Sequence, residues 1–261
     1  MHRGVMGRPL SVVIPTLQEA ERLPLLLADL AAAAPGLIAE CVVVDGGSLD
    51  GTAALAQQAG ATTLRCEPGR GLQLQIGVAA SEAPWVLLLH ADSRLSPGWA
   101  AAVQQAITGS DGESTPCAWH FDLAVEGHGL PLRLLELAVA WRCRWRRLPY
   151  GDQGLLLPRR LLEAAGGVRP LPLMEDLDLV LRLQQIASIR SLALPLTVNG
   201  RRWQQLGVLT TARRNAALRR AWRLGRSPDI LAARYYGSSS VVRPTPERIR
   251  HRAAADPQHQ R

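Results

Sequence analysis

The 261-residue sequence contains no lysine, and all 30 of its basic side chains are arginine. An all-arginine set is typical of GC-rich coding and indicates no particular function. Aromatic residues are scarce at 4%, with only one phenylalanine beside seven tryptophans. The four cysteines are far apart and none forms a C-x-x-C pair, so neither a zinc site nor a disulfide framework is indicated.

Long hydrophobic runs are also missing. No stretch of 18 uncharged apolar residues occurs, so we expect no transmembrane helix. The nearest candidate, residues 130–141, is interrupted by Arg133 and Glu136. The apolar run 10–15 is too short for the core of a signal peptide. These absences predict a cytoplasmic protein, which could work at the inner face of the membrane.

Charge is divided unevenly along the chain. Residues 1–130 carry 6 arginines and 13 acidic residues, a net charge of −7, whereas residues 131–261 carry 24 arginines and 9 acidic residues, a net charge of +15. A basic half can attract phosphates, nucleic acid or an anionic membrane. The apolar content of 47% is ordinary for a globular protein and excludes a disordered chain.

Short apolar runs alternate with helical segments over the first 90 residues. The runs lie at 10–15, 41–45, 61–66 and 85–90, and Ala- and Leu-rich segments between them span 19–33, 52–59 and 73–81. Four strands interleaved with three helices predict a parallel sheet covered on both faces. In such sheets ligands collect at the carboxyl ends of the strands, so polar residues there are the first site candidates.

The pattern changes after residue 95. We expect helices at 97–108, 131–144, 159–165, 175–185, 204–223 and 229–236, strands at 117–125, 154–157, 189–192 and 196–199, and an exposed loop at 110–115. No internal repeat or long linker divides the chain. The sequence predicts one domain with Arg-rich C-terminal helices, followed by a disordered tail from residue 237.

Carboxylates follow two of the predicted strands. Asp45 precedes two glycines, which let a ligand approach the backbone closely, and its carboxylate could accept hydrogen bonds from a base or a ribose. His90 and Asp92 are two residues apart, so in an extended segment both could face one ligand, such as a cation bridging phosphates. The alternatives are a strand-to-helix turn with Asp50 as N-cap, which would not account for Asp45, and a surface loop with a hydrogen-bonded histidine.

Further candidates follow later strands or open a helix. Glu175 and Asp176 begin the most amphipathic segment; acidic residues suit a helix start, but one here could also act as a general base. Arg70 and the run 201–203 offer guanidinium forks that suit phosphate. Asp152 lies between glycines in G-D-Q-G and is uninformative by itself.

Taken in order, these motifs resemble those of a family-two glycosyltransferase with the GT-A fold. They are V-V-I-P-T-x-Q-E, V-V-D-G-G-S-x-D-G-T, G-R-G, L-L-H-A-D-S, P-Y-G-D-Q-G, P-L-M-E-D-L-D-L and R-R-W. The pattern is most similar to a bacterial subgroup labelled selenodomain-associated transferase. The resemblance implies an α/β fold of the GT-A type, with a mostly parallel nucleotide-binding sheet flanked by helices and with C-terminal amphipathic helices.

The resemblance also implies a division of the single domain, residues 1–236. A nucleotide-binding part covers about 9–95, an acceptor part about 96–203, and C-terminal helices about 204–236. The implied reaction moves one sugar from a nucleotide-diphosphate sugar, expected to be a UDP-sugar, to an acceptor hydroxyl on a lipid or small metabolite. The anomeric carbon is inverted in a single in-line displacement.

Residue roles follow from the same resemblance. The residues implied to bind the nucleotide sugar are Pro15, Thr16, Glu19, Asp45, Gly46, Arg70, Gly71, Ala91, Asp92, Asp152, Arg202 and Trp203. Asp92 and His90 would ligate Mg²⁺ or Mn²⁺, and Asp176, beside Glu175, would deprotonate the acceptor.

Three departures from the family pattern qualify these roles. His90 replaces the first Asp of the D-x-D motif, Gln18 replaces an Asn, and only the R-W end of Q-x-x-R-W is present. The last departure favours transfer of one sugar over processive synthesis.

Two alternatives remain open. A sugar-phosphate nucleotidyltransferase would have a Gly-rich basic loop after the first strand, where residues 15–19 stand instead. A non-enzymatic protein could bind nucleic acid or membrane through helices 204–236. Nucleic acid is the less favoured partner, and membrane contact is compatible with catalysis.

Overall fold

The computed structural model describes residues 9–110 and 115–236. Its strands are β1 (Leu10–Thr16), β2 (Ile38–Asp45), β3 (Thr62–Arg65), β4 (Trp85–Leu88), β5 (Arg94–Leu95), β6 (Cys117–Val125), β7 (Leu155–Pro158) and β8 (Ser188–Val198). They form one sheet in the order β3-β2-β1-β4-β7-β6-β8-β5. The predicted tail at 237–261 and residues 111–114 of the predicted loop lie outside the described residues.

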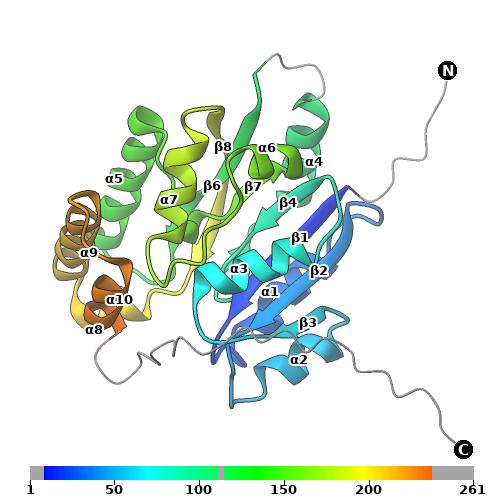
Figure 1. Cartoon of the computed structure of the whole chain (residues 1–261), viewed down its shortest axis with the longest axis horizontal. Coiled ribbons are helices and arrows are strands. Elements are labelled where there is room, and N and C mark those ends of the chain that lie inside the picture. The colour runs from blue at the N-terminus through cyan, green and yellow to red at the C-terminus, as the bar shows by residue number, and fades with distance from the viewer. Residues whose placement is uncertain (1–8, 111–114, 237–261) are drawn as a thin grey trace, which may run out of the picture.

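Helices cover both faces of this sheet (Figure 1). They are α1 (Leu23–Ala31), α2 (Thr52–Gln58), α3 (Arg70–Ala79), α4 (Trp99–Gly109), α5 (Leu130–Arg146), α6 (Arg159–Ala164), α7 (Glu175–Leu183), α8 (Arg201–Leu206), α9 (Val208–Arg223) and α10 (Pro228–Tyr236), with a 3-10 turn, η2, at Gly151–Gln153. In the described part of the chain, no helix combines the length and the apolar character needed to cross a bilayer.

The first four strands pair in parallel, as the alternating pattern predicts. β1 and β2 pair from Leu10 opposite Ile38 to Thr16 opposite Asp45, with one register shift between Leu10 and Ser11, and both strands end at the same edge of the sheet. This edge therefore receives the chain after β1, β2 and β4, as expected for ligand-binding sheets of this type.

The other strands make the sheet mixed. β7 lies antiparallel to β4 and β6, whereas β6 and β8 are parallel. β8 is one strand where two were predicted. Its pairing with β6 shifts register beside Ala193, whose φ of +55° marks a bulge rather than a chain reversal.

The side chains of β1 alternate between two hydrophobic cores. Leu10, Val12 and Ile14 pack with α1, α2 and α4, while Val13 belongs to the core that includes α3, α6 and α7. The C-terminal helices join this second core, to which α9 contributes Leu218 and α10 contributes the fully buried Leu231. They are therefore packed parts of the domain.

The segment predicted as one helix from residue 204 to 223 is divided. α8 begins at Arg201 and ends at Leu206, and Gly207 separates it from α9 with a φ of +78°. Glycine adopts this left-handed conformation without the steric cost that a Cβ would add. The R-R-W motif consequently lies in the first turn of a helix.

Candidate functional site

Two cavities open near the carboxyl ends of β1 and β4, and Arg70, His90 and Asp92 line both of them. We call the one of about 400 Å³ the strand-end cavity. Its predicted lining residues are Pro15, Thr16, Glu19, Arg70, His90, Ala91 and Asp92. We call the one of about 290 Å³ the helical cavity, and its predicted lining residues are Arg70, His90, Asp92, Asp152, Asp176 and Trp203. The sequence motifs thus converge on one region.

Four of the predicted site residues line neither of these two cavities: Asp45, Gly46, Gly71 and Glu175. The side chain of Arg202 lies outside the described part. Gly71 is needed for packing, because a Cβ there would lie 2.5 Å from the carbonyl oxygen of Leu171. Its missing side chain lets the loop before α7 rest directly on the first turn of α3.

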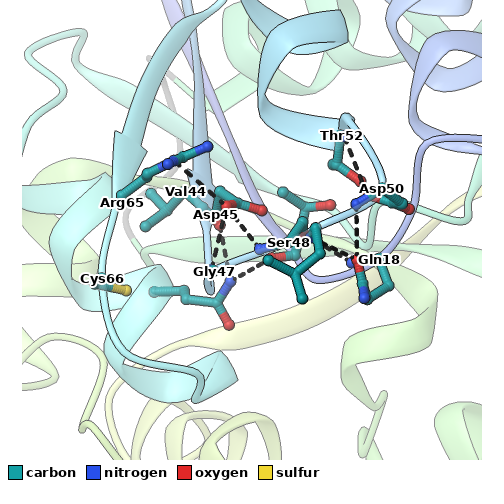
Figure 2. Close-up of polar contacts among 12 residues, drawn as sticks. Gln18, Val44, Asp45, Gly47, Ser48, Asp50, Thr52, Arg65 and Cys66 are labelled. Carbon is teal, nitrogen blue, oxygen red and sulfur yellow. Dashed lines mark hydrogen bonds and ion pairs between the residues drawn. The ribbon is translucent and has the colours of Figure 1, made fainter.

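Asp45 is buried in the turn that follows β2 (Figure 2). Its Oδ2 accepts hydrogen bonds from the backbone N–H groups of Gly47 and Ser48, at 3.1 and 3.0 Å, and lies 3.8 Å from the Nε of Arg65. Its Oδ1 is buried and accepts no hydrogen bond. In this conformation the carboxylate shapes the turn.

Gln18 joins the loop after β1 to that turn (Figure 2). Its Oε1 accepts hydrogen bonds from the N–H groups of Leu49 and Asp50, at 2.9 and 3.2 Å, and its own N–H donates to the Oγ of Ser48 at 2.8 Å. Its φ of +56° is uncommon for a residue with a side chain. Gln18, which replaces the Asn of the family motif, therefore has a structural role, because its side-chain amide connects the loop after β1 to the turn after β2 beside the strand-end cavity.

A partly buried ion pair connects the starts of α3 and α7 at the junction of the cavities. The Arg70 guanidinium pairs with Glu175, and its Nη1 lies 3.4 Å from the Nε2 of His90. Burial, together with the positive charge of Arg70, lowers the pKa of His90 and keeps its imidazole neutral. Burial also raises the pKa of Glu175, although the Arg70 charge opposes this effect. Glu175 thus holds Arg70 in place.

Asp176 is the ionised carboxylate of the helical cavity. Its Oδ2 accepts a hydrogen bond from the N–H of Gly151 and its Oδ1 from that of Leu177, both at 2.7 Å. Burial would raise the pKa of Asp176, but the Arg70 charge and these two N–H donors lower it below the usual value. Met174, with a φ of +69°, makes the sharp turn that starts α7 here.

Asp152 has a contrasting environment in the same cavity. Burial raises the pKa of Asp152 to about 6, and its Oδ1 is buried without a hydrogen-bond partner. In the strand-end cavity, burial and the nearby Asp92 raise the pKa of Glu19 to about 7. The site therefore contains carboxyl groups in both protonation states near neutral pH.

The residues around Asp92 fit a divalent cation that a ligand's phosphates would help to hold. Within residues 9–110 and 115–236, no group of three or more His, Cys, Asp or Glu side chains could hold a metal ion. Asp92 is the carboxylate shared by both cavities, and burial raises its pKa although the charges of Arg70, Arg22 and Arg201 oppose this effect. Mg²⁺ commonly takes one or two carboxylates and completes its shell with phosphate oxygens and water. His90 fits less well, since its Nε2 faces Arg70.

One wall of the helical cavity was missed by sequence reasoning. Thr211, Asn215 and Arg219 line it from α9. The Thr211 Oγ1 and Asn215 Oδ1 are buried without hydrogen-bond partners, and the Arg219 guanidinium stacks 4.9 Å from the centre of the Tyr150 ring. Their spacing of four residues places them on one helix face and could have revealed them.

Sequence comparisons match the first part of the chain to known proteins. Residues 11–119 match the model of glycosyl transferase family 2. An uncharacterized glycosyltransferase of Mycobacterium tuberculosis is 33% identical over 153 residues, which cover 56% of this chain and 65% of that protein. Glucosyl-3-phosphoglycerate synthase of Mycolicibacterium paratuberculosis is 33% identical over 95 residues, 33% of this chain and 29% of that protein. The chain thus spans less than two thirds of either relative.

Solved structures show the same fold at low sequence identity. Glucosyl-3-phosphoglycerate synthase of M. tuberculosis, in complex with Mn²⁺, UDP-glucose and phosphoglyceric acid, superposes with a TM-score of 0.50 at 22% identity, over 72% of this chain and 71% of that one. S. aureus TarS, residues 1–349 with UDP-GlcNAc, has a TM-score of 0.55 at 16% identity, over 73% of this chain and 58% of that one. The α/β architecture predicted from the sequence is therefore confirmed, while the subgroup label stays a prediction.

Proposed function

We propose that the chain, whose residues 11–119 match the model of glycosyl transferase family 2, transfers one sugar from a UDP-sugar to an acceptor hydroxyl. One observation carries the proposal: the strand-end and helical cavities meet at Arg70, His90 and Asp92. A transferase must hold a donor and an acceptor with their reacting atoms in contact. We assign the donor nucleotide to the strand-end cavity and the acceptor to the helical cavity.

The strand-end cavity supports nucleotide binding. Pro15, Thr16 and Glu19 line it from the end of β1 and the following loop. Gly46 contributes indirectly, because its N–H donates to the Thr16 carbonyl oxygen at 2.9 Å, and Asp45 holds the turn that places Gly46. Arg70 also lines this cavity and supplies positive charge toward the diphosphate.

A divalent cation, Mg²⁺ or Mn²⁺, would be held by Asp92, and when bound it would supply positive charge to the leaving diphosphate. The neighbouring Arg70 contributes a fixed positive charge to the same region, and Glu175 orients it. Because His90 is neutral and adjacent to Arg70, it adds no further positive charge there. The M. tuberculosis structure with Mn²⁺ and UDP-glucose supports cation use in this fold.

We assign the role of base to Asp176. It lines the helical cavity in its ionised form, and the N–H groups of Gly151 and Leu177 fix the orientation of its carboxylate. An ionised carboxylate there can accept the proton of an acceptor hydroxyl as that oxygen attacks the anomeric carbon. Attack opposite the leaving diphosphate inverts that carbon. Trp203 and Asp152 line the same cavity and can contact the sugar or the acceptor.

The family match favours sugar transfer over the two alternatives. A nucleotidyltransferase would need the basic Gly-rich loop that this chain lacks after β1. Binding of nucleic acid alone would leave the two joined cavities unexplained. Membrane contact is compatible with transfer, and a lipid-linked acceptor would require it.

Slow hydrolysis of a nucleotide-sugar panel tests the proposal, because water can replace an unknown acceptor. We expect UDP release from one UDP-sugar with Mn²⁺ or Mg²⁺, and calorimetric binding of UDP that weakens by about tenfold or more in Asp92→Asn. Asp122→Asn is the matched control, since Asp122 lines neither cavity and bonds to Ser191 on β8. Failure of the wild type to bind UDP would contradict the proposal, as would equal binding by Asp92→Asn.

A further inference from the structure

Helix α5 presents a row of large apolar side chains to solvent. Leu130, Leu134, Leu137, Trp141 and Trp145 are 71%, 55%, 65%, 60% and 70% exposed. Their spacing of three or four residues places them in one line along the helix. We call this row the α5 stripe.

The fold does not account for the α5 stripe. The opposite face of α5 packs Leu132, Val139 and Cys143 against β6 and β8. One apolar face is enough to attach a helix to its core, so the second face contributes nothing to this packing. Contiguous exposed apolar surface of this kind marks a site of interaction with another molecule or a membrane.

Positive charge surrounds the stripe at its C-terminal end. Arg144, Arg146 and Arg147 are exposed, and no acidic side chain of the described residues forms an ion pair with them. Helix α9 contacts α5 at the same outer edge of the molecule and adds the exposed Arg213 and Arg220 (Figure 1). Leucine and tryptophan beside clustered arginine are the composition of helices that lie in the interface of an anionic bilayer.

We propose that the α5 stripe docks the protein on an anionic phospholipid membrane. The helix lies flat in the interface, with Trp141 and Trp145 at headgroup depth, where indole rings are favoured. The surrounding arginines contact lipid phosphates. The membrane contact predicted for residues 204–236 is thereby assigned mainly to α5, with the outer arginines of α9 in support.

Where the proposed function holds, this docking also places the helical cavity, to which we assign the acceptor, near the bilayer. Trp203 packs against the core cluster beneath α5 and also lines the helical cavity. Trp203 therefore contacts both the core beneath α5 and the helical cavity. An acceptor hydroxyl on a lipid headgroup could reach that cavity from the docked surface.

Other occupants of the stripe are less well matched. Within residues 237–261 the large aliphatic side chains are Val241, Val242 and Ile249, too few to cover five exposed positions. A second copy of the chain would bring the arginines of two α5 helices together, which like-charge repulsion opposes. An anionic bilayer satisfies both the apolar row and its basic border.

Co-sedimentation of the full chain with vesicles tests the proposal. We expect binding to phosphatidylcholine vesicles containing phosphatidylglycerol and much weaker binding to pure phosphatidylcholine. Trp141→Ser with Trp145→Ser should weaken binding by about tenfold or more. Arg144→Gln with Arg146→Gln should weaken it by about 25-fold at low salt, because each arginine contributes about a fivefold factor.

Leu25→Ser with Leu49→Ser is the matched control, since both leucines are exposed but lie far along the chain from α5. Donor hydrolysis and circular dichroism should be unchanged in all these variants, so that loss of folding or of the proposed activity is recognised separately. Equal sedimentation of the stripe variant and the wild type would overturn the proposal. So would a dimer in light scattering that the tryptophan variant dissociates.

Discussion

Two aspartates in one cavity differ in their hydrogen bonds and therefore in their chemistry. Asp176 accepts two backbone N–H bonds and has a lowered pKa, whereas Asp152 has an unpartnered oxygen and a raised pKa. An ionised, oriented carboxylate can take a proton at neutral pH, while a carboxyl group that titrates near pH 6 is partly protonated there.

We therefore expect Asp176→Asn to lower the rate of donor hydrolysis by about 10²–10⁴-fold. Asp152→Asn should have a smaller effect on kcat, because Asn keeps one acceptor oxygen and its NH2 group replaces the O–H donor of a protonated Asp152. Initial rates at saturating donor measure both effects, with thermal melting as the control for folding. If Asp152→Asn loses more activity than Asp176→Asn, the base is Asp152.

The sequence motifs could predict which residues gather at the site but not how each is used. Pro15, Thr16, Glu19 and Asp92 follow apolar strands, and the parallel sheet brings the ends of those strands together. Asp45 is different, because its carboxylate turns back onto the N–H groups of its own loop. Whether the Asp45 carboxylate faces its own loop or a ligand depends on local backbone dihedrals, which side-chain type alone does not determine.

At the scale of elements, β1, β2 and β4 of the parallel half could be located because each contains a nearly continuous apolar run. The break between α8 and α9 and the continuity of β8 could not be predicted from the sequence. Gly207 could sit inside a helix or end one, and Ala193 gives no sign of its left-handed conformation. The polar row Thr211, Asn215 and Arg219 on α9 was not among the predicted site residues, although it lines the helical cavity.

One carboxylate connects three elements of the parallel half. Glu40 of β2 accepts hydrogen bonds from the Ser11 hydroxyl of β1 at 2.6 Å and from the N–H groups of Glu82 and Ala83, just before β4, at 2.6 and 3.3 Å. Burial alone would raise the pKa of Glu40, but these three donors lower it. The ionised form of Glu40 thus stabilises this junction.

Because the pKa of Glu40 is lower in the folded than in the unfolded chain, its stabilisation is present above the unfolded value of about 4.3 and is lost as the pH falls through the folded value. Glu40→Gln should therefore reduce the free energy of unfolding near pH 7 and make little difference at pH 3. Urea unfolding over pH 3–7 measures this, with the exposed Glu163→Gln as control. A pH-independent difference between the wild type and Glu40→Gln would contradict the assignment.

On the scale of the whole molecule, the C-terminal helices complete the site begun by the N-terminal strands. Ala232 and Tyr236 of α10 line the strand-end cavity together with Pro15 and Thr16, and Tyr235 lines the helical cavity. Residues from both the acidic N-terminal half and the basic C-terminal half of the chain therefore line the site. Glu19 and Asp92 come from the acidic half and Arg219 from the basic half.

Leu231 anchors α10 and is fully buried. We expect Leu231→Ala to reduce the free energy of unfolding by about 2–5 kcal/mol. The same substitution should weaken UDP binding, because α10 forms a wall of the strand-end cavity, to which we assign the donor. Denaturant unfolding and calorimetry measure the two effects. Leu224→Ala, at a side chain that is 75% exposed, should change neither. Unchanged UDP affinity in a destabilised Leu231→Ala would show that α10 does not matter for the donor.

The return of α10 to the first strand also affects how the protein is made. Chains fold from the N-terminus as they leave the ribosome, so the sheet can form while the last helices are still being synthesised. Until residues 228–236 emerge, the strand-end cavity lacks the wall formed by Ala232 and Tyr236. The strand-end cavity of the nascent chain is therefore incomplete until α10 has been synthesised and has packed against the sheet.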